Sequence, residues 1–274
     1  MVIDSHVHFW NFSKENDTWI TDNMKILQQD FLPVNILPTL NKACVDAVVA
    51  VQAGQSEIET DFLLSLAQTN SFISGVVGWV DLQNENIEDR LNYYEQFKVI
   101  KGWRHIVQAE PERFLSSKKF IKGIAQLQQF NYTYDILVYH HQLKDVLQLV
   151  QIFPHQKFVI DHCAKPDVKN KSNEPWKTLI KEISNFPNVF CKLSGLLTET
   201  NWQQWEIDDF YPYLDIVIEA FGTKRVLFGS DWPVMLLSGE YAQWKNLIEK
   251  YLKSFSAEDQ RNIMGKNAIS FYNL

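Results

Sequence analysis

Eight short apolar runs, each followed by a longer segment of helical periodicity, constrain the fold of this chain more than any other feature. The runs span residues 2–6, 45–53, 73–80, 99–103, 134–139, 157–162, 189–194 and 225–231. Between them, apolar residues recur every three or four positions, as in the stripe Ile58, Phe62 and Leu66 that follows the capping box Ser56–Glu59. Because a parallel neighbour can be reached only through a crossover segment, the pattern predicts parallel strands connected by helices.

Eight such units in 274 residues match a (β/α)8 TIM barrel, which closes its own sheet edges, and we expect a single domain over residues 1–274. An open doubly wound sheet is the alternative, but no GxGxxG turn follows any of the runs. No linker or repeat indicates a second domain. Two polar segments, 11–29 and 167–174, are expected to be loops whose side chains help to choose the substrate.

Charge and cysteine content restrict the kind of partner and the compartment. With 26 Lys+Arg against 33 Asp+Glu the net charge is −7 without a basic cluster, which argues against nucleic-acid or anionic-membrane partners. Three widely spaced cysteines without a CxxC pair indicate neither a disulfide framework nor a structural zinc cluster. The N-terminus lacks a signal-peptide pattern and no apolar run approaches the roughly 20 residues that span a bilayer. We therefore expect a cytoplasmic protein; the sequence leaves its oligomeric state open, a homo-oligomer included.

In a barrel of this kind the functional site lies at the carboxyl ends of the strands, and the first run ends in His6 followed by His8. Side chains alternate along a strand, so both imidazoles point the same way, about 6 to 7 Å apart, and can share one metal ion. The sixth run ends in His162 and is followed by Lys165. The eighth run ends in Asp231, a position suited to a general base.

The fourth run continues into Arg104 and His105, which are candidate substrate-binding residues. Arg104 is a permanent cation suited to a carboxylate or to a developing oxyanion. Pro111 fixes a turn that would present Gln108 or Glu110 inward, and Glu110 is therefore a further candidate metal ligand.

Two other strand ends add weaker candidates. His140 and His141 follow the fifth run, and because adjacent residues face opposite ways only one of them is expected at the site. Ser194 is a candidate for a substrate hydrogen bond rather than a nucleophile, because no GxSxG elbow surrounds it. Imidazoles and a carboxylate that hold a water, next to a cation that polarises a carbonyl, are the chemistry of hydrolysis.

The motifs at these strand ends resemble those of the amidohydrolase superfamily. The resemblance is carried by IDSHVH at 3–8, GWRH at 102–105 with QAEP at 108–111, DHCAKP at 161–166, KLSGL at 192–196, FGSDWP at 228–233 and NAISFY at 267–272. More narrowly, the sequence is similar to the branch that contains L-fuconolactonase, L-rhamnonolactonase and pyrone-dicarboxylate lactonase. The motifs span nearly the whole chain.

The resemblance implies an enzyme that opens the ester bond of a sugar-acid lactone similar to L-fucono-1,4-lactone. The core of its site would consist of four residues: His6, His8, His162 and Asp231. Asp231 would activate the water and return the proton to the leaving group. The lactone carbonyl would be polarised by Arg104, His162 or a divalent ion, and Lys165 would be a further cationic contact. Trp10 and Trp232 are candidates for stacking on the C–H face of a sugar ring.

The metal content follows from the same resemblance. The carboxylated lysine that is usual in the superfamily has no clear counterpart, which implies at most one divalent ion, with zinc expected at His6, His8, His162 and Asp231. A metal-free site, in which cationic residues polarise the carbonyl, is the alternative. Two other functions remain open: a metal-dependent decarboxylase of the same superfamily, and a barrel that binds a small ligand without turnover.

Overall fold

The computed structural model describes residues 1–274 and confirms the barrel. Eight parallel strands follow one another in sequence order around a single sheet: β1 (Ile3–Val7), β2 (Ala47–Val51), β3 (Ile73–Gly78), β4 (Ile100–His105), β5 (Thr133–Ile136), β6 (Phe158–Ile160), β7 (Val189–Leu193) and β8 (Val226–Phe228). The sheet closes just beyond β8, where Asp231 N donates to the His6 carbonyl at 2.9 Å and His8 N donates to the Trp232 carbonyl at 2.7 Å. Closure brings the ends of β1 and β8 together.

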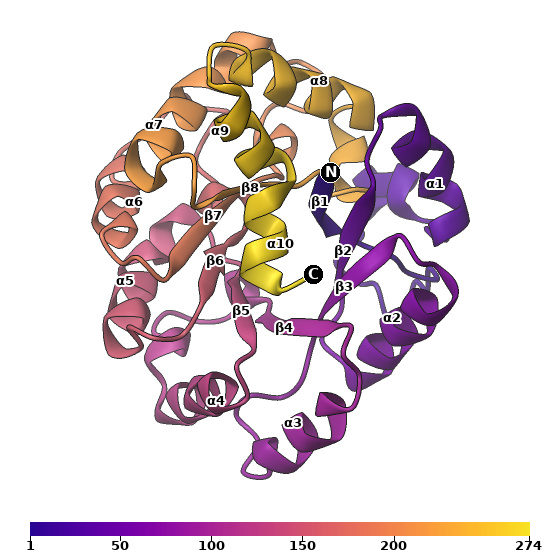
Figure 1. Cartoon of the computed structure of the whole chain (residues 1–274), viewed down its shortest axis with the longest axis vertical. Coiled ribbons are helices and arrows are strands. Elements are labelled where there is room, and N and C mark those ends of the chain that lie inside the picture. The colour runs from indigo at the N-terminus through magenta and orange to yellow at the C-terminus, as the bar shows by residue number, and fades with distance from the viewer.

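A ring of helices surrounds the strands (Figure 1), and it consists of α1 (Pro33–Lys42), α2 (Glu57–Thr69), α3 (Ile87–Glu95), α4 (Lys118–Gln129), α5 (Leu143–Ile152), α6 (Trp176–Ser184), α7 (Tyr211–Phe221) and α8 (Tyr241–Leu252). The chain ends with α9 (Ala257–Arg261), a π-helical turn (Asn262–Lys266) and α10 (Asn267–Tyr272). None of these helices has the length and apolar character needed to cross a membrane.

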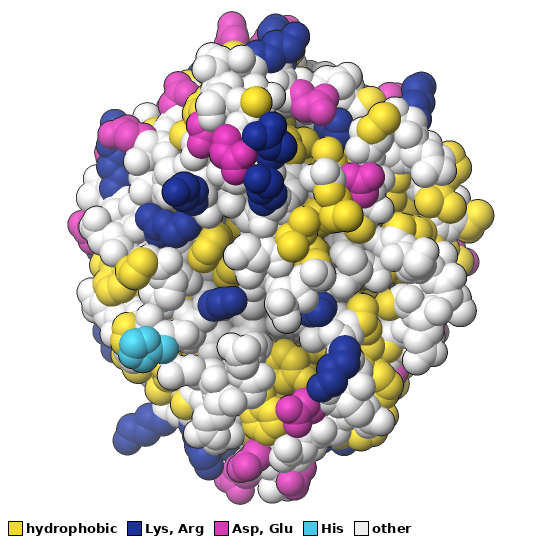
Figure 2. Space-filling view, in the orientation of Figure 1, with side chains coloured by type: hydrophobic (Ala, Val, Ile, Leu, Met, Phe, Trp, Pro, Cys, Tyr) yellow, Lys and Arg dark blue, Asp and Glu magenta, His cyan; other side chains and the backbone are white.

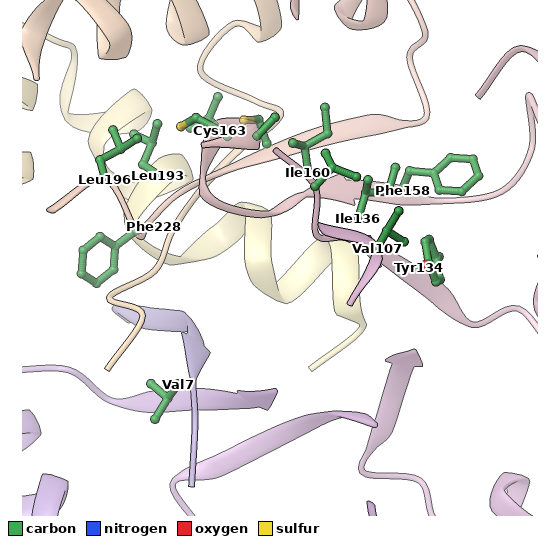
Figure 3. Close-up of a cluster of buried hydrophobic side chains, with 14 of the residues drawn as sticks. Val7, Val107, Tyr134, Ile136, Phe158, Ile160, Cys163, Leu193, Leu196 and Phe228 are labelled. Carbon is green, nitrogen blue, oxygen red and sulfur yellow. The ribbon is translucent and has the colours of Figure 1, made fainter. Parts of the chain in front are cut away.

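Alternation along the strands divides the apolar core into two parts. The outward-facing side chains pack against the helices in a cluster of 68 buried residues, which includes Tyr134 and Ile136 of β5 and Phe158 and Ile160 of β6 (Figure 3). A second cluster of nine residues fills the lower part of the barrel: Ile3, Val49, Val51, Val77, Val159, Leu227, Ala268, Phe271 and Tyr272. The last three belong to α10, so this helix seals the amino-terminal end of the barrel.

The face of the molecule that carries α10 is seen in Figure 2, where cationic and anionic side chains are interspersed. Functional side chains are expected at the opposite end, where the strands terminate.

Candidate active site

Three imidazoles converge on one carboxylate at the carboxyl ends of the strands. Asp231 Oδ1 lies 3.3 Å from His8 Nε2 and 3.8 Å from both His6 Nε2 and His162 Nε2. The Nε2 atoms of His6 and His8 are 3.1 Å apart, and all four side chains are at most 5% exposed. The structure thus brings together the four residues expected from the sequence to form the core of a site.

The outer nitrogens of two of these rings are held by neighbouring strands. His8 Nδ1 lies 2.7 Å from the Val51 carbonyl oxygen, so Nδ1 carries the proton and Nε2 keeps a free lone pair. Ser194 Oγ lies 2.9 Å from His162 Nδ1 and fixes that ring. Ser194, expected as a substrate contact, is fully buried and orients His162 instead.

A left-handed turn after β6 carries His162 and Lys165. The four residues His162–Lys165 have φ between +48° and +58°, and none is a glycine. Each such residue costs about 1–2 kcal/mol, so the surroundings must hold the turn in place. Trp176 Nε1 donates to the Cys163 carbonyl at 2.7 Å, and His140 Nδ1 lies 2.8 Å from the Lys165 carbonyl oxygen. The turn directs both His162 and Lys165 into one cavity.

A layer of buried charges lies directly beneath the histidines. Lys192 Nζ is 2.5 Å from Asp135 Oδ2, 3.0 Å from Asp161 Oδ1 and 3.1 Å from His6 Nδ1. Tyr272 of α10 donates to Asp135 Oδ2 at 2.7 Å. No role was expected for Asp135, Asp161 or Lys192 from the sequence, although a charged residue inside an otherwise apolar run was an available signal. This layer of charged residues links α10, at the amino-terminal end of the barrel, to His6.

Arg104 lies in the same layer and reaches the site from β4. Its Nη1 is 3.0 Å from Asp161 Oδ2, and its Nη2 donates to the Gln52 carbonyl. The Nη1 atom also lies 3.3 Å from His6 Nε2. A metal ion and the guanidinium are therefore alternative partners for the lone pair of His6 Nε2.

Burial and neighbouring charges set the protonation states needed for this chemistry. Burial lowers the pKa of His162 to about 4 and lowers the pKa of His6 well below its usual value. Burial alone would raise the pKa of Asp231, but contacts with His162, His8 and Lys165 outweigh it and hold that pKa below the usual value. Near neutral pH the site therefore presents neutral His6 and His162 rings and an ionised Asp231 carboxylate.

The donor set fits one divalent ion. Ligand atoms of His6, His8 and Asp231 all lie within 4.8 Å of one another, as do those of His6, Asp161 and His162. Imidazole nitrogen and carboxylate oxygen are the donors that zinc prefers besides thiolate, and a partner on the second ring nitrogen, as at His8, is typical of a metal-binding histidine.

A cavity of about 500 Å³ opens above these residues. Six residues expected at the site contribute to its lining: His8, Arg104, Gln108, His162, Lys165 and Asp231. The polar segment 11–29 supplies Trp19 and Met24, whereas 167–174 supplies no lining residue. The loop after β7 lines the cavity instead, with Thr198, Glu199 and Trp202, and no motif in the sequence marks these three residues.

His105 and Glu110 lie outside the cavity, contrary to expectation. Because Arg104 points into the barrel, the adjacent His105 points outward, where it stacks on Phe114 with ring centroids 4.6 Å apart. His105 Nε2 is 2.8 Å from Glu110 Oε1. The Glu110 carboxylate therefore contacts His105 and does not lie with the three imidazoles around Asp231.

Trp10 and Trp232 also fall outside the cavity lining. Both pack on Phe31, with ring centroids 5.3 and 5.2 Å away, and Trp10 Nε1 donates to the Gln29 carbonyl at 2.9 Å. Neither His140 nor His141 lines the cavity, whereas the ring of Tyr139 does.

Comparison with known proteins agrees with this fold. The amidohydrolase family model matches residues 3–274. The chain is 35% identical over 284 residues to an L-fucono-1,5-lactonase of Burkholderia multivorans, covering 99% of this chain and 96% of that protein. It is 31% identical over 277 residues to an L-fucono-1,5-lactonase of Burkholderia ambifaria, covering 99% and 95%.

A solved structure of an amidohydrolase from Burkholderia multivorans with bound zinc superimposes with a TM-score of 0.97 at 35% identity, covering 100% of this chain and 99% of that one. A closed (β/α)8 barrel with imidazoles and a carboxylate at its strand ends defines a class of hydrolytic barrels. The chain belongs to the amidohydrolase family.

Proposed function

We propose that this protein hydrolyses the ester bond of a sugar-acid lactone, with L-fucono-1,5-lactone as the first candidate. The observation that carries the proposal is the convergence of three imidazoles on Asp231, next to a cavity lined by His8, His162 and Asp231 together with Arg104 and Lys165. Two relatives that match this chain along its whole length are L-fucono-1,5-lactonases. Their names specify the six-membered ring, so we favour the 1,5-lactone over the 1,4-lactone suggested by the sequence motifs.

Asp231 is the proposed base. Its carboxylate takes a proton from a water that attacks the lactone carbonyl, and a carbon–oxygen bond forms. The ring carbon–oxygen bond then breaks, and the proton returns from Asp231 to the departing alkoxide. Arg104 and Lys165 stabilise negative charge that develops on the carbonyl oxygen, and general base catalysis of this kind contributes roughly 10²–10⁴-fold to the rate.

We further propose that the site holds one zinc ion through His6, His8 and Asp231, with His162 beside it. Support comes from the donor set and from the zinc-containing relative. When bound, the ion supplies Lewis acidity that polarises the carbonyl. The buried Asp161 would act on this site by orienting His6, since its Oδ1 lies 3.3 Å from His6 Nδ1.

The test measures acid release from L-fucono-1,5-lactone and L-fucono-1,4-lactone, next to CO₂ release from a dihydroxybenzoate. We expect enzyme-dependent hydrolysis of the 1,5-lactone and no CO₂ release. Decarboxylation without lactone hydrolysis would support the decarboxylase alternative. Binding of the lactone without turnover would support the ligand-binding alternative, and either result contradicts the proposal.

A further inference from the structure

We propose that Glu199, paired with Lys165, determines specificity by binding the hydroxyl groups of the lactone ring. This inference rests on the proposed function, since it concerns the substrate of the same cavity. It assigns to Glu199 a role separate from bond breaking: recognition of a polyhydroxylated ring as opposed to an unsubstituted one.

Glu199 occupies a fixed position in the cavity wall. It ends the 3-10 turn Leu197–Glu199 after β7, and its backbone is held at both sides. Its N–H donates to the Leu196 carbonyl at 3.2 Å, and its carbonyl accepts from Lys169 N at 3.0 Å. The carboxylate is 19% exposed and lines the same cavity as His162 and Asp231. A side chain on such an anchored turn can select a ligand by geometry.

The charged groups of Glu199 and Lys165 are both free to form hydrogen bonds with a ligand. Their closest polar atoms, Oε1 and Nζ, are 3.8 Å apart, which is too long for a direct hydrogen bond. Neither the carboxylate nor the ammonium makes a hydrogen bond to any other protein group, although the ammonium lies 5.2 Å from the centre of the Tyr139 ring. One acceptor group and one donor group thus face a cavity without close partners.

Partial burial makes it unfavourable for the Glu199 carboxylate to remain without a hydrogen-bond donor. Burial raises the pKa of Glu199, and the nearby Lys165 offsets that effect only in part. A carboxylate that water solvates poorly gains from a hydroxyl donor, and hydrogen bonds to a charged group contribute more than those to a neutral one.

A sugar-acid lactone supplies the hydrogen-bond donors and acceptors that Glu199 and Lys165 lack. One ring hydroxyl can donate to the Glu199 carboxylate and an adjacent one can accept from the Lys165 ammonium. Because an ammonium has three N–H donors, Lys165 can serve this hydroxyl and the carbonyl oxygen together. A lactone without hydroxyls would leave both charged groups without a hydrogen-bond partner in a partly desolvated wall. Sites built to bind a hydroxyl discriminate strongly against analogues that lack it.

The experiment compares kcat/KM for L-fucono-1,5-lactone with kcat/KM for δ-valerolactone, which has the same ring without hydroxyls. In Glu199→Gln we expect the ratio of the two values to fall about 10- to 100-fold, mostly through KM of the sugar lactone. Glu88→Gln is the matched control, because Glu88 is exposed on α3 and makes no ion pair. A ratio within twofold of wild type in Glu199→Gln would overturn the proposal.

Two further measurements distinguish failure of the proposed role of Glu199 from failure of the proposed function. If Glu199→Gln does not fold, Glu199→Asp retains the charge and should lower the ratio by a smaller factor; an unchanged ratio there overturns the proposal. If the wild type hydrolyses neither lactone, the proposed function fails. Calorimetry with L-fuconate then decides: at least tenfold weaker binding by Glu199→Gln supports the role of the pair, whereas equal binding or none overturns it.

Discussion

At the scale of single residues, the position of His162 depends on Gly195. A Cβ at position 195 would lie 2.4 Å from His162 Nδ1, and the backbone there has φ +64°. Both the space and the conformation therefore require glycine. Ser194 Oγ and Gly195 both lie next to Nδ1 of His162, so small changes at either residue should move the ring that faces Asp231.

We expect Gly195→Ala to destabilise the fold by about 2–4 kcal/mol and to lower kcat at least tenfold, since backbone strain and displacement of His162 add together. Gly222→Ala is the control: φ is +67° there, but nothing lies within 4 Å of the added carbon. It should cost about 1–3 kcal/mol through backbone strain alone, with kcat unchanged. Denaturant unfolding and lactone hydrolysis measure both effects, and equal losses in the two variants would refute the steric argument.

At the scale of elements, α10 reaches the buried layer of charges through the hydroxyl of Tyr272. Tyr272 donates to the fully buried Asp135, which also contacts Lys192. Tyr251 donates to Asp215 at the same distance, 2.7 Å, but at the surface. Removing the two hydroxyls therefore compares a buried hydrogen bond to a carboxylate with an exposed one.

Tyr272→Phe should lower the free energy of unfolding by about 1–3 kcal/mol, because a buried charged acceptor loses a donor. Tyr251→Phe should change it by less than about 0.5 kcal/mol, because water replaces the hydroxyl. Chemical denaturation at neutral pH gives both values. A loss in Tyr251→Phe as large as that in Tyr272→Phe would mean that burial does not decide the effect.

The junction between β2 and α2 shows a second effect of burial. The Ser56 side chain accepts from Glu59 N at 3.2 Å as the capping box predicts, but the Glu59 carboxylate accepts from Ala53 N and from Gly54 N. Burial raises the pKa of Glu59 from 4.5 to about 7, despite those hydrogen bonds. Between these two values the folded chain holds one proton more than the unfolded chain, so this residue favours folding more as the pH falls.

The stability of the wild type relative to Glu59→Gln should therefore increase by about 1–3 kcal/mol as the pH falls from 8 to 5. Urea unfolding at several pH values measures the difference between the two proteins, in which other titrating groups cancel. A difference that is independent of pH, or that shrinks on acidification, would contradict the raised pKa.

At the scale of the whole molecule, the sequence was sufficient for the barrel and for most of the central site. Residues directly at a strand end, such as His6 and Asp231, follow from periodicity and the closure of the sheet. Glu199 could not be found in this way, because the path of a loop depends on tertiary contacts. His105 was expected at the site but points outward, because the sequence does not tell which residue of an adjacent pair points into the barrel.

A bound ion should stabilise the whole barrel, because its proposed ligands lie at the carboxyl ends of β1 and β8 and the unfolded chain does not hold them together. Zinc at about 100 times its Kd should raise Tm by roughly 5–10 °C, and a chelator should reverse the rise and reduce hydrolysis. His6→Ala should abolish the shift. Full activity and an unchanged Tm after chelation would instead assign carbonyl polarisation to Arg104 and Lys165.

The most direct test of the account is kcat for L-fucono-1,5-lactone in Asp231→Asn, with Tm measured alongside. The amide keeps the shape of the side chain but cannot accept the proton of water, so we expect kcat to fall about 10²–10⁴-fold in a folded protein. A kcat within tenfold of wild type would contradict the assignment of Asp231 as the base at the centre of this site.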